Sequence, residues 1–166
     1  MSEHYRVAGY VKLAKLWERN REQVIAYQRQ YYAEKFSGMA NVELADVYID
    51  ITGQKEICHR PEMIRLLADC YAGHIHCIAA QTKAYLAANA QEFCFLLKTI
   101  FSIGWRIDIV TEDDAYNINT ITNAEDQYNE LLRMANEYAA LESDAYRKWV
   151  HKLQNAVSAH NREVSR

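Results

Sequence analysis

Short apolar runs alternate along the first two thirds of the chain with longer segments in which apolar residues recur every three or four positions. The apolar runs suit buried strands, and we place them at Arg6–Leu13, Ala45–Ile49, Ile75–Ala80 and Arg106–Val110. The periodic segments between them predict helices, at about Trp17–Phe36, from Pro61 to Gly73 and at Ala88–Ile103. Because strands joined through helices need crossover connections, we expect an α/β fold: a mainly parallel sheet of four to five strands with helices on both faces.

The last third of the chain has a different pattern. Thr122 and Glu125 have the spacing of a capping box, and neither proline nor glycine follows them up to Arg166. We therefore expect an α/β domain over residues 1–121 and one long helix over 122–166, a rod of roughly 60 Å. So long a helix cannot bury its apolar stripe against so small a domain, and we expect a second copy to cover it. The expected dimer interface comprises Leu131, Leu132, Ala135, Tyr138 and Trp149.

Composition narrows the class of protein without identifying a function. A chain of 166 residues with one proline, five glycines and a net charge of −3 fits one globular domain. No apolar run approaches the roughly 18 residues of a membrane span, so we expect a cytoplasmic protein without a membrane partner. Any contact with nucleic acid must be local, because the net charge does not favour it.

The cysteine and histidine positions give no strong metal motif. The four cysteines contain no Cys-x-x-Cys pair, and free thiols are expected. His74 and His76 would share one face of a strand, but no third ligand is near them in the sequence. We therefore expect neither a metal site nor a cofactor.

Four landmarks carry the functional information: Tyr10–Ala14, Tyr48–Asp50, Arg60-Pro61 and Gln81–Asn89. Their order and distances over roughly residues 6–145 resemble the catalytic domain of the serine recombinases, the resolvase and invertase family. At the first landmark that family has Tyr-x-Arg-Val-Ser, whose serine attacks a DNA phosphate. This chain has Lys12 and Ala14 at the arginine and serine positions. A methyl group cannot form the phosphoserine bond, so the resemblance implies the fold and argues against the reaction.

The second family motif, approximately Lys-Ser-Leu-Asp-Arg-Leu-x-Arg-Asn, is also altered. Leu86 and Asn89 match it, and the changed positions hold Gln81, Thr82, Ala84, Tyr85 and Ala88. Phosphoryl transfer without a metal needs arginines around the phosphate oxygens. Of the family's charged groups Arg60 is retained, and Asp50 fits the end of the second strand.

The remaining cations allow two interpretations. Lys12 and Arg60 are the candidates for a retained phosphate contact, which Lys12 would make as a point charge. The simpler interpretation, which we favour, is a solvated lysine and an arginine paired with Glu56 or Glu62. Likewise, Thr82 and Asn89 are explained by turn and capping roles alone.

Charge reverses along the expected C-terminal helix. Acids dominate from Glu125 to Asp144 and bases from Arg147 onward. This is similar to the family arrangement, in which the helix forms the dimer and then crosses the DNA backbone. Such contacts give affinity without reading sequence, and the alternative is an ordinary solvated helix end. The candidate DNA-backbone contacts are Arg147, Lys148, Lys152 and Arg162. Family members usually continue into a DNA-binding domain, whereas this sequence stops at Arg166, so we do not expect it to recognise a DNA site alone.

The leading hypothesis is a catalytically inactive serine-recombinase-like protein. It would act in site-specific recombination of a mobile element, as a DNA-associated regulator or as a partner subunit, in a homodimer or with an active recombinase. One alternative is a protein-interaction scaffold without DNA binding. Another is an active recombinase with a remodelled site, in which Thr82, Tyr10 or Tyr85 replaces the serine.

Overall fold

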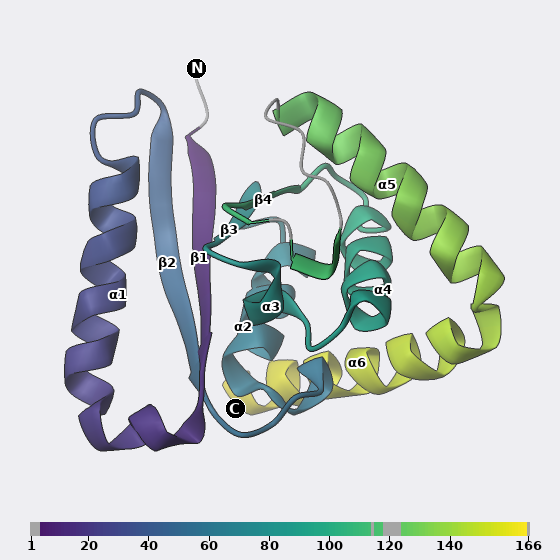
Figure 1. The fold of residues 1–166 in the computed structure, drawn as a ribbon, viewed down its shortest axis with the longest axis horizontal. Coiled ribbons are helices and arrows are strands. Elements are labelled where there is room, and N and C mark those ends of the chain that lie inside the picture. Colours follow the sequence, from purple (N-terminus) through teal and green to yellow (C-terminus); the bar gives the residue numbers. More distant parts are fainter. Residues whose placement is uncertain (1–3, 114, 118–123, 166) are drawn as a thin grey trace.

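A four-stranded parallel sheet forms the centre of the molecule (Figure 1). The computed structural model describes residues 4–113, 115–117 and 124–165. The strands lie in the order β2-β1-β3-β4, with bounds β1 Tyr5–Leu13, β2 Val42–Ile51, β3 Cys77–Ala80 and β4 Asp108–Thr111. The expected strands and their parallel pairing are confirmed, with shifts of a few residues at the ends.

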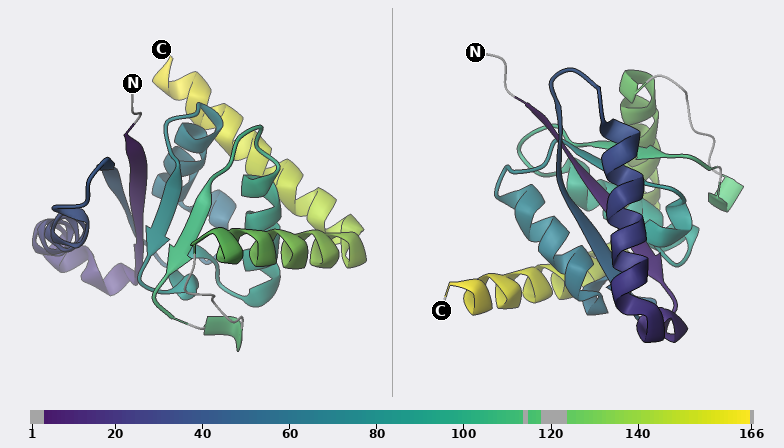
Figure 2. Two further views of the ribbon diagram at one scale, coloured as in Figure 1. Left: turned by 90° about the horizontal axis from the view of Figure 1, so that it is seen from above. Right: turned by 90° about the vertical axis from the view of Figure 1, so that its left-hand side faces the viewer.

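Helices cover both faces of this sheet, as expected. In Figure 2, α1 lies alone against one face, on the opposite side from the other long helices. The helices and turns are η1 Lys15–Asn20, α1 Arg21–Phe36, η2 Ile57–His59, α2 Pro61–Tyr71, α3 Lys83–Leu86, α4 Ala90–Phe101, η3 Ala115–Asn117, α5 Ala124–Leu141 and α6 Ser143–Val164. The expected first helix differs at its start, where η1 is a 3-10 helix. Pro61 begins α2, where its missing N–H costs no hydrogen bond.

Alternation along β1 assigns its side chains to two cores. Ala8 and Tyr10 face the larger core with α2, α4 and the C-terminal helices, while Val7 and Val11 face α1. On the α1 face Gly9 lets Tyr32 approach the strand closely, because a Cβ at Gly9 would lie 2.8 Å from the Tyr32 ring. The fold therefore places a thick helical layer on one side and the single helix α1 on the other.

A long C-terminal helix is confirmed as α6, but the expected single rod over residues 122–166 is wrong. The helical segment divides at Glu142, which has φ −113° and ψ 43°, into α5 and α6. Figure 1 shows α6 turning back beneath the domain instead of extending away from it. Neither proline nor glycine causes the change of direction. The change of direction lets both helices pack on one core. Leu131 and Ala135 of α5 are buried there, as are Leu153 and Val157 of α6.

The apolar stripe expected to need a second copy is thus buried within the chain. Leu131 and Ala135 are at most 1% exposed, and Leu132 is half-buried. The Tyr138 and Trp149 rings lie 5.9 and 5.8 Å from that of Phe95 on α4. The argument for a dimer from an uncovered stripe is therefore wrong, and dimerisation itself stays a prediction.

Three further expectations concern the capping box, membrane spans and the cysteines. The capping box lies outside the described residues, since Thr122 and the Glu125 side chain are not among them. Within the described parts of the chain, none of the helices has the length and apolar character needed to cross a membrane. All four cysteines are free thiols, and Cys70, Cys77 and Cys94 are buried.

Candidate functional site

The family landmarks meet at the carboxyl edge of the sheet. Lys12 near the end of β1 pairs in register with Asp50 near the end of β2, and β3 ends just before Gln81. Parallel strands bring such ends together at one edge. Ala14 is exposed at this edge, at the start of η1. Ala14, which the resemblance aligns with the family's serine, is therefore accessible and carries a methyl group.

Asp50 is buried and organises the start of α2. Its Oδ1 accepts a hydrogen bond from the Glu62 amide (2.9 Å), and its Oδ2 from the Met63 amide (2.8 Å). The Tyr10 hydroxyl also donates to Oδ2, at 2.8 Å. A carboxylate on the first-turn amides satisfies donors that have no partner inside the helix and interacts favourably with the helix dipole. Burial, followed by the Asp50 charge, raises the pKa of Tyr10 well above its usual value.

Arg60 is 1% exposed and holds three segments together. One terminal nitrogen donates to the Tyr85 carbonyl at 2.7 Å, and the other donates to the Lys55 carbonyl at 2.8 Å. Its Nε is buried and has no partner among the described residues. The expectation that Arg60 pairs with Glu56 or Glu62 is wrong, because its terminal nitrogens bind backbone carbonyls. Because these nitrogens already donate to carbonyls, Arg60 is poorly placed to contact an external phosphate.

Basic groups nevertheless gather at this edge. The pKa of Lys12 is lowered by partial burial and then by the charges of Arg60 and Lys55, with Asp50 opposing. Burial is the largest cause, and the smaller contributions of Arg60 and Lys55 reflect repulsion between like charges. An anion beside Lys12 would relieve that repulsion.

The Gln81–Asn89 landmark forms a short helical turn tied to the end of β4. The Thr82 hydroxyl hydrogen-bonds to the Asp113 carboxylate and accepts from the Ala84 amide at 3.2 Å. The Lys83 amide also donates to Asp113, at 2.9 Å, and Lys83 Nζ donates to the Asp113 carbonyl at 2.8 Å. Burial acts to raise the pKa of Asp113, but the hydrogen bonds from Thr82 and Lys83 lower it overall. The capping role considered for Thr82 is confirmed.

Sequence reasoning missed Lys83 and Asp113. Lys83 is fully buried although a lysine in a polar motif suggests exposure. The available signal was the position of Asp113 just after β4, at the edge where the other landmarks meet. Ala84 and Ala88, at the family's aspartate and second arginine, are exposed, and Tyr85 is half-buried. Asn89 caps α4 by accepting the Glu92 amide at 2.9 Å.

A cavity of about 480 Å³ lies between the loop before α2, the start of α4 and α6. Lys55, Lys148 and Lys152 line it, together with Ala88 and Asn89 of the Gln81–Asn89 landmark. At its margin the buried Glu92 accepts from the Trp149 indole nitrogen at 3.0 Å and fixes α6 against α4. Two of the candidate DNA contacts, Lys148 and Lys152, therefore line the same cavity as Lys55 and Asn89.

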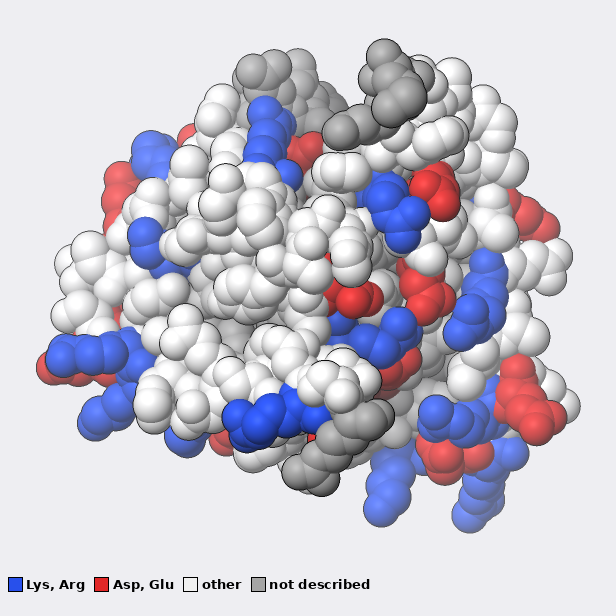
Figure 3. All heavy atoms as spheres, turned by 180° about the vertical axis from the view of Figure 1, so that it is seen from behind, with Lys and Arg blue, Asp and Glu red and all other residues white. Residues whose placement is uncertain are grey.

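The other candidate DNA contacts lie elsewhere. Arg147 forms an ion pair with Asp144, and Arg162 lies in the last turn of α6. Figure 3 shows basic and acidic side chains mixed over the face that it draws, with uncharged atoms covering much of it. Any electrostatic attraction for nucleic acid is accordingly local.

Comparisons with known proteins identify the fold. No family model matches the sequence, and no curated protein does. Among solved structures, the N-terminal catalytic domain of TP901-1 integrase matches with TM-score 0.54 and 17% identity, over 84% of this chain and 98% of that one. A resolvase family site-specific recombinase from Streptococcus pneumoniae matches with TM-score 0.53 and 12% identity, over 94% of this chain and 98% of that one. The chain therefore has the fold of a resolvase-type recombinase catalytic domain, as its landmarks implied.

Proposed function

We propose that this chain is a catalytically inactive serine-recombinase-like protein that holds DNA through its backbone. It would act as a regulator or partner subunit in site-specific recombination of a mobile element. The observation that carries the proposal is Ala14, which is exposed at the end of β1 where a nucleophile would be needed. A methyl group offers no atom for attack on phosphorus.

The surroundings of Ala14 support loss of the reaction. Ala88 and Tyr85 replace arginines, and Arg60 is committed to the carbonyls of Lys55 and Tyr85. The loss of one well-aimed donor typically lowers a rate by about 10²–10³-fold. The combined changes remove both the nucleophile and the planar cations that stabilise transferred phosphate.

The cavity lysines support a binding role. Lys55, Lys148 and Lys152 come from a loop and a helix that converge on one hollow, and Lys55 also acts on Lys12. A phosphate backbone laid along this hollow would meet several cations at once. Such contacts carry no sequence information. We therefore propose that an active recombinase, in the same assembly, selects the DNA site.

Binding of duplex DNA measured by fluorescence anisotropy over a salt series tests this function. We expect the affinity of the full chain to fall as salt rises, with a linear dependence of log affinity on log salt. Removal of α6 is unsuitable as a test, because Leu153 and Val157 are buried in the core. Absence of binding at low salt would contradict the proposal.

A protein-interaction scaffold is the second candidate, and an observation on α1 favours it. An open hollow of about 320 Å³ is lined there by Leu13, Trp17, Val24 and Tyr27. Trp17 is 45% and Tyr27 65% exposed, and exposed aromatic residues are enriched at protein interfaces. Absence of DNA binding would move the assignment to this class.

The remodelled enzyme has the least support. Tyr10 is buried with a raised pKa and donates to Asp50. The Thr82 hydroxyl already serves as a cap, and burial raises the pKa of Tyr85. None of these groups has the exposure and activation that a nucleophile requires.

A further inference from the structure

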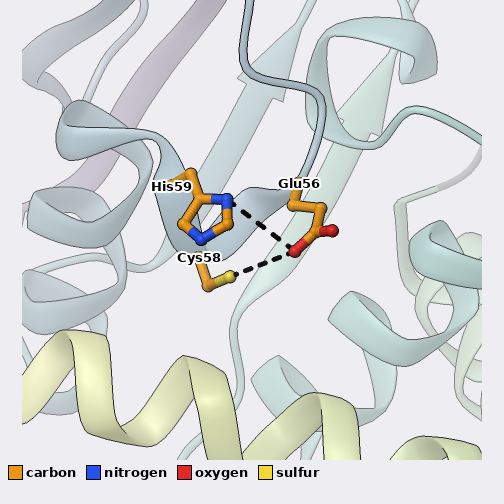
Figure 4. A group of neighbouring side chains, drawn as sticks. All are labelled: Glu56, Cys58 and His59. Carbon is orange, nitrogen blue, oxygen red and sulfur yellow. Dashed lines mark hydrogen bonds and ion pairs between the residues drawn. The ribbon is translucent and has the colours of Figure 1, made fainter.

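The turn before α2 brings together three side chains that metals bind. Glu56, Cys58 and His59 offer an oxygen, a sulfur and a nitrogen, all within 4.8 Å of one another. Figure 4 shows the three side chains converging on one side of the turn. Glu56 Oε2 lies 3.6 Å from Cys58 Sγ and 3.8 Å from His59 Nδ1.

These separations are close to those of a tetrahedral zinc site. Bond lengths of about 2.3 Å to sulfur and about 2.0–2.1 Å to nitrogen and oxygen imply ligand separations of roughly 3.3–3.6 Å. The oxygen–sulfur separation already has this value, and the oxygen–nitrogen separation exceeds it slightly. The sulfur–nitrogen separation is within 4.8 Å, and rotation of the exposed Glu56 and His59 side chains would shorten it.

The backbone of the turn is fixed by buried charged groups on two sides. Arg60 donates to the Lys55 carbonyl, immediately before Glu56, at 2.8 Å. Glu92 accepts from the Ile57 amide at 3.3 Å. Ile57 itself is fully buried. The ligand side chains therefore project from a rigid support, which lowers the entropy lost when they converge on an ion.

We propose that Glu56, Cys58 and His59 bind a divalent transition metal, Zn²⁺ being the ion that best suits this mixed ligand set. Three protein ligands leave a fourth position for water or another ligand. A hollow of about 300 Å³ lined by Cys58, His59, Lys152, Asn155 and Ala156 gives that position room. On binding, the Cys58 thiol gives up its proton to solvent and coordinates as thiolate. Glu56, Cys58 and Lys152 also line the cavity proposed to hold DNA, so the two sites adjoin, but the metal proposal does not rest on DNA binding.

Lys152 provides a further test of the proposal. Its ammonium group lines the same hollow and would repel a bound cation. Lys152→Gln should therefore strengthen metal binding while it weakens any contact with DNA, so the two proposals predict opposite effects of one substitution.

Titration of the full chain with Zn²⁺ by calorimetry, and with Co²⁺ by absorption spectroscopy, tests the site. We expect binding of one ion per chain and a thiolate-to-cobalt charge-transfer band. Cys58→Ser should abolish the band. His59→Gln should weaken Zn²⁺ binding by at least about tenfold, because even the loss of a residue that only hydrogen-bonds to a metal ligand weakens metal binding by that factor. His74→Gln, an exposed histidine away from the turn, is the matched control and should bind as the unchanged chain does.

Circular dichroism of each variant without metal checks that folding is intact, which we expect because His59 is exposed and Cys58 partly so. An unchanged band in Cys58→Ser would overturn the proposal. So would equal affinities of the His59→Gln and His74→Gln variants, or weaker Zn²⁺ binding by Lys152→Gln.

Discussion

The carboxyl edge of the sheet has two layers that differ in what their polar groups do. In the buried layer, Tyr10 donates to Asp50, Asp50 accepts from the Met63 amide, and Arg60 donates to the Tyr85 carbonyl. In the exposed layer, Ala14 and Ala88 stand where the resemblance places reactive or charged groups. The buried polar groups satisfy backbone donors and acceptors that would otherwise be costly. This contrast indicates that the fold depends on the inner layer and can exist without chemistry in the outer one.

The largest effect is expected from Arg60→Met. The substitution leaves the Lys55 and Tyr85 carbonyls without their donor, and loss of two buried hydrogen bonds should lower the free energy of unfolding by about 3 kcal/mol. The urea unfolding midpoint measures this loss of stability. Arg19→Met, at an exposed position of η1, is the control. A loss below about 1 kcal/mol would show that Arg60 is dispensable to the fold.

Asp50→Ala should have the next largest effect. It removes the acceptor of the Glu62 and Met63 amides, and loss of such a cap costs up to about 2 kcal/mol. Tyr10→Phe is the matched comparison, because it removes one bond to Asp50 and leaves the α2 amides satisfied. Equal destabilisation by the two variants would contradict the capping role.

Acid should weaken the contact between the end of β4 and the Gln81–Asn89 landmark. The lowered pKa of Asp113 means that its carboxylate is favoured in the folded chain. Its stabilising contribution is therefore present above the unfolded pKa, about 3.9, and is lost as the pH falls through the lower folded value. We compare the unfolding midpoint of the unchanged chain with that of Asp113→Asn. The difference between them should shrink as the pH falls from about 6 to about 3, a range that spans the unfolded pKa. A difference that stays constant would exclude the linkage. Glu22→Gln on α1 controls for loss of an exposed negative charge.

Ala14→Ser should have the smallest effect. The position is exposed, so the unfolding free energy should change by less than about 0.5 kcal/mol. The added hydroxyl should also give no covalent protein–DNA adduct on a denaturing gel, because the surrounding arginines are still missing. An adduct would show that the outer layer retains more of the reaction than its residues indicate.

The sequence predicted much of the inner architecture because strand and helix periods are local signals. The four parallel strands and the helix starting at Pro61 were predicted correctly. The turn at Glu142 was missed, since no breaking residue marks it and the cause is packing of Leu153 and Val157 on the same core. The partners of Arg60 were missed for a related reason, because they are backbone carbonyls from distant segments. The cluster of Glu56, Cys58 and His59 needed the geometry of a turn, whereas the sequence search looked for paired cysteines.

The salt dependence of duplex-DNA binding tests the account most directly, when the full chain is compared with a variant carrying Lys55→Gln, Lys148→Gln and Lys152→Gln. The control removes equal charge elsewhere, through Arg29→Gln, Lys98→Gln and Arg133→Gln. If the cavity holds the DNA backbone, the cavity variant should bind more weakly, with a slope of log affinity against log salt that is shallower by up to about 3, while the control keeps a slope near that of the unchanged chain. Equal slopes in all three proteins, or no binding by the unchanged chain, would contradict the central claim.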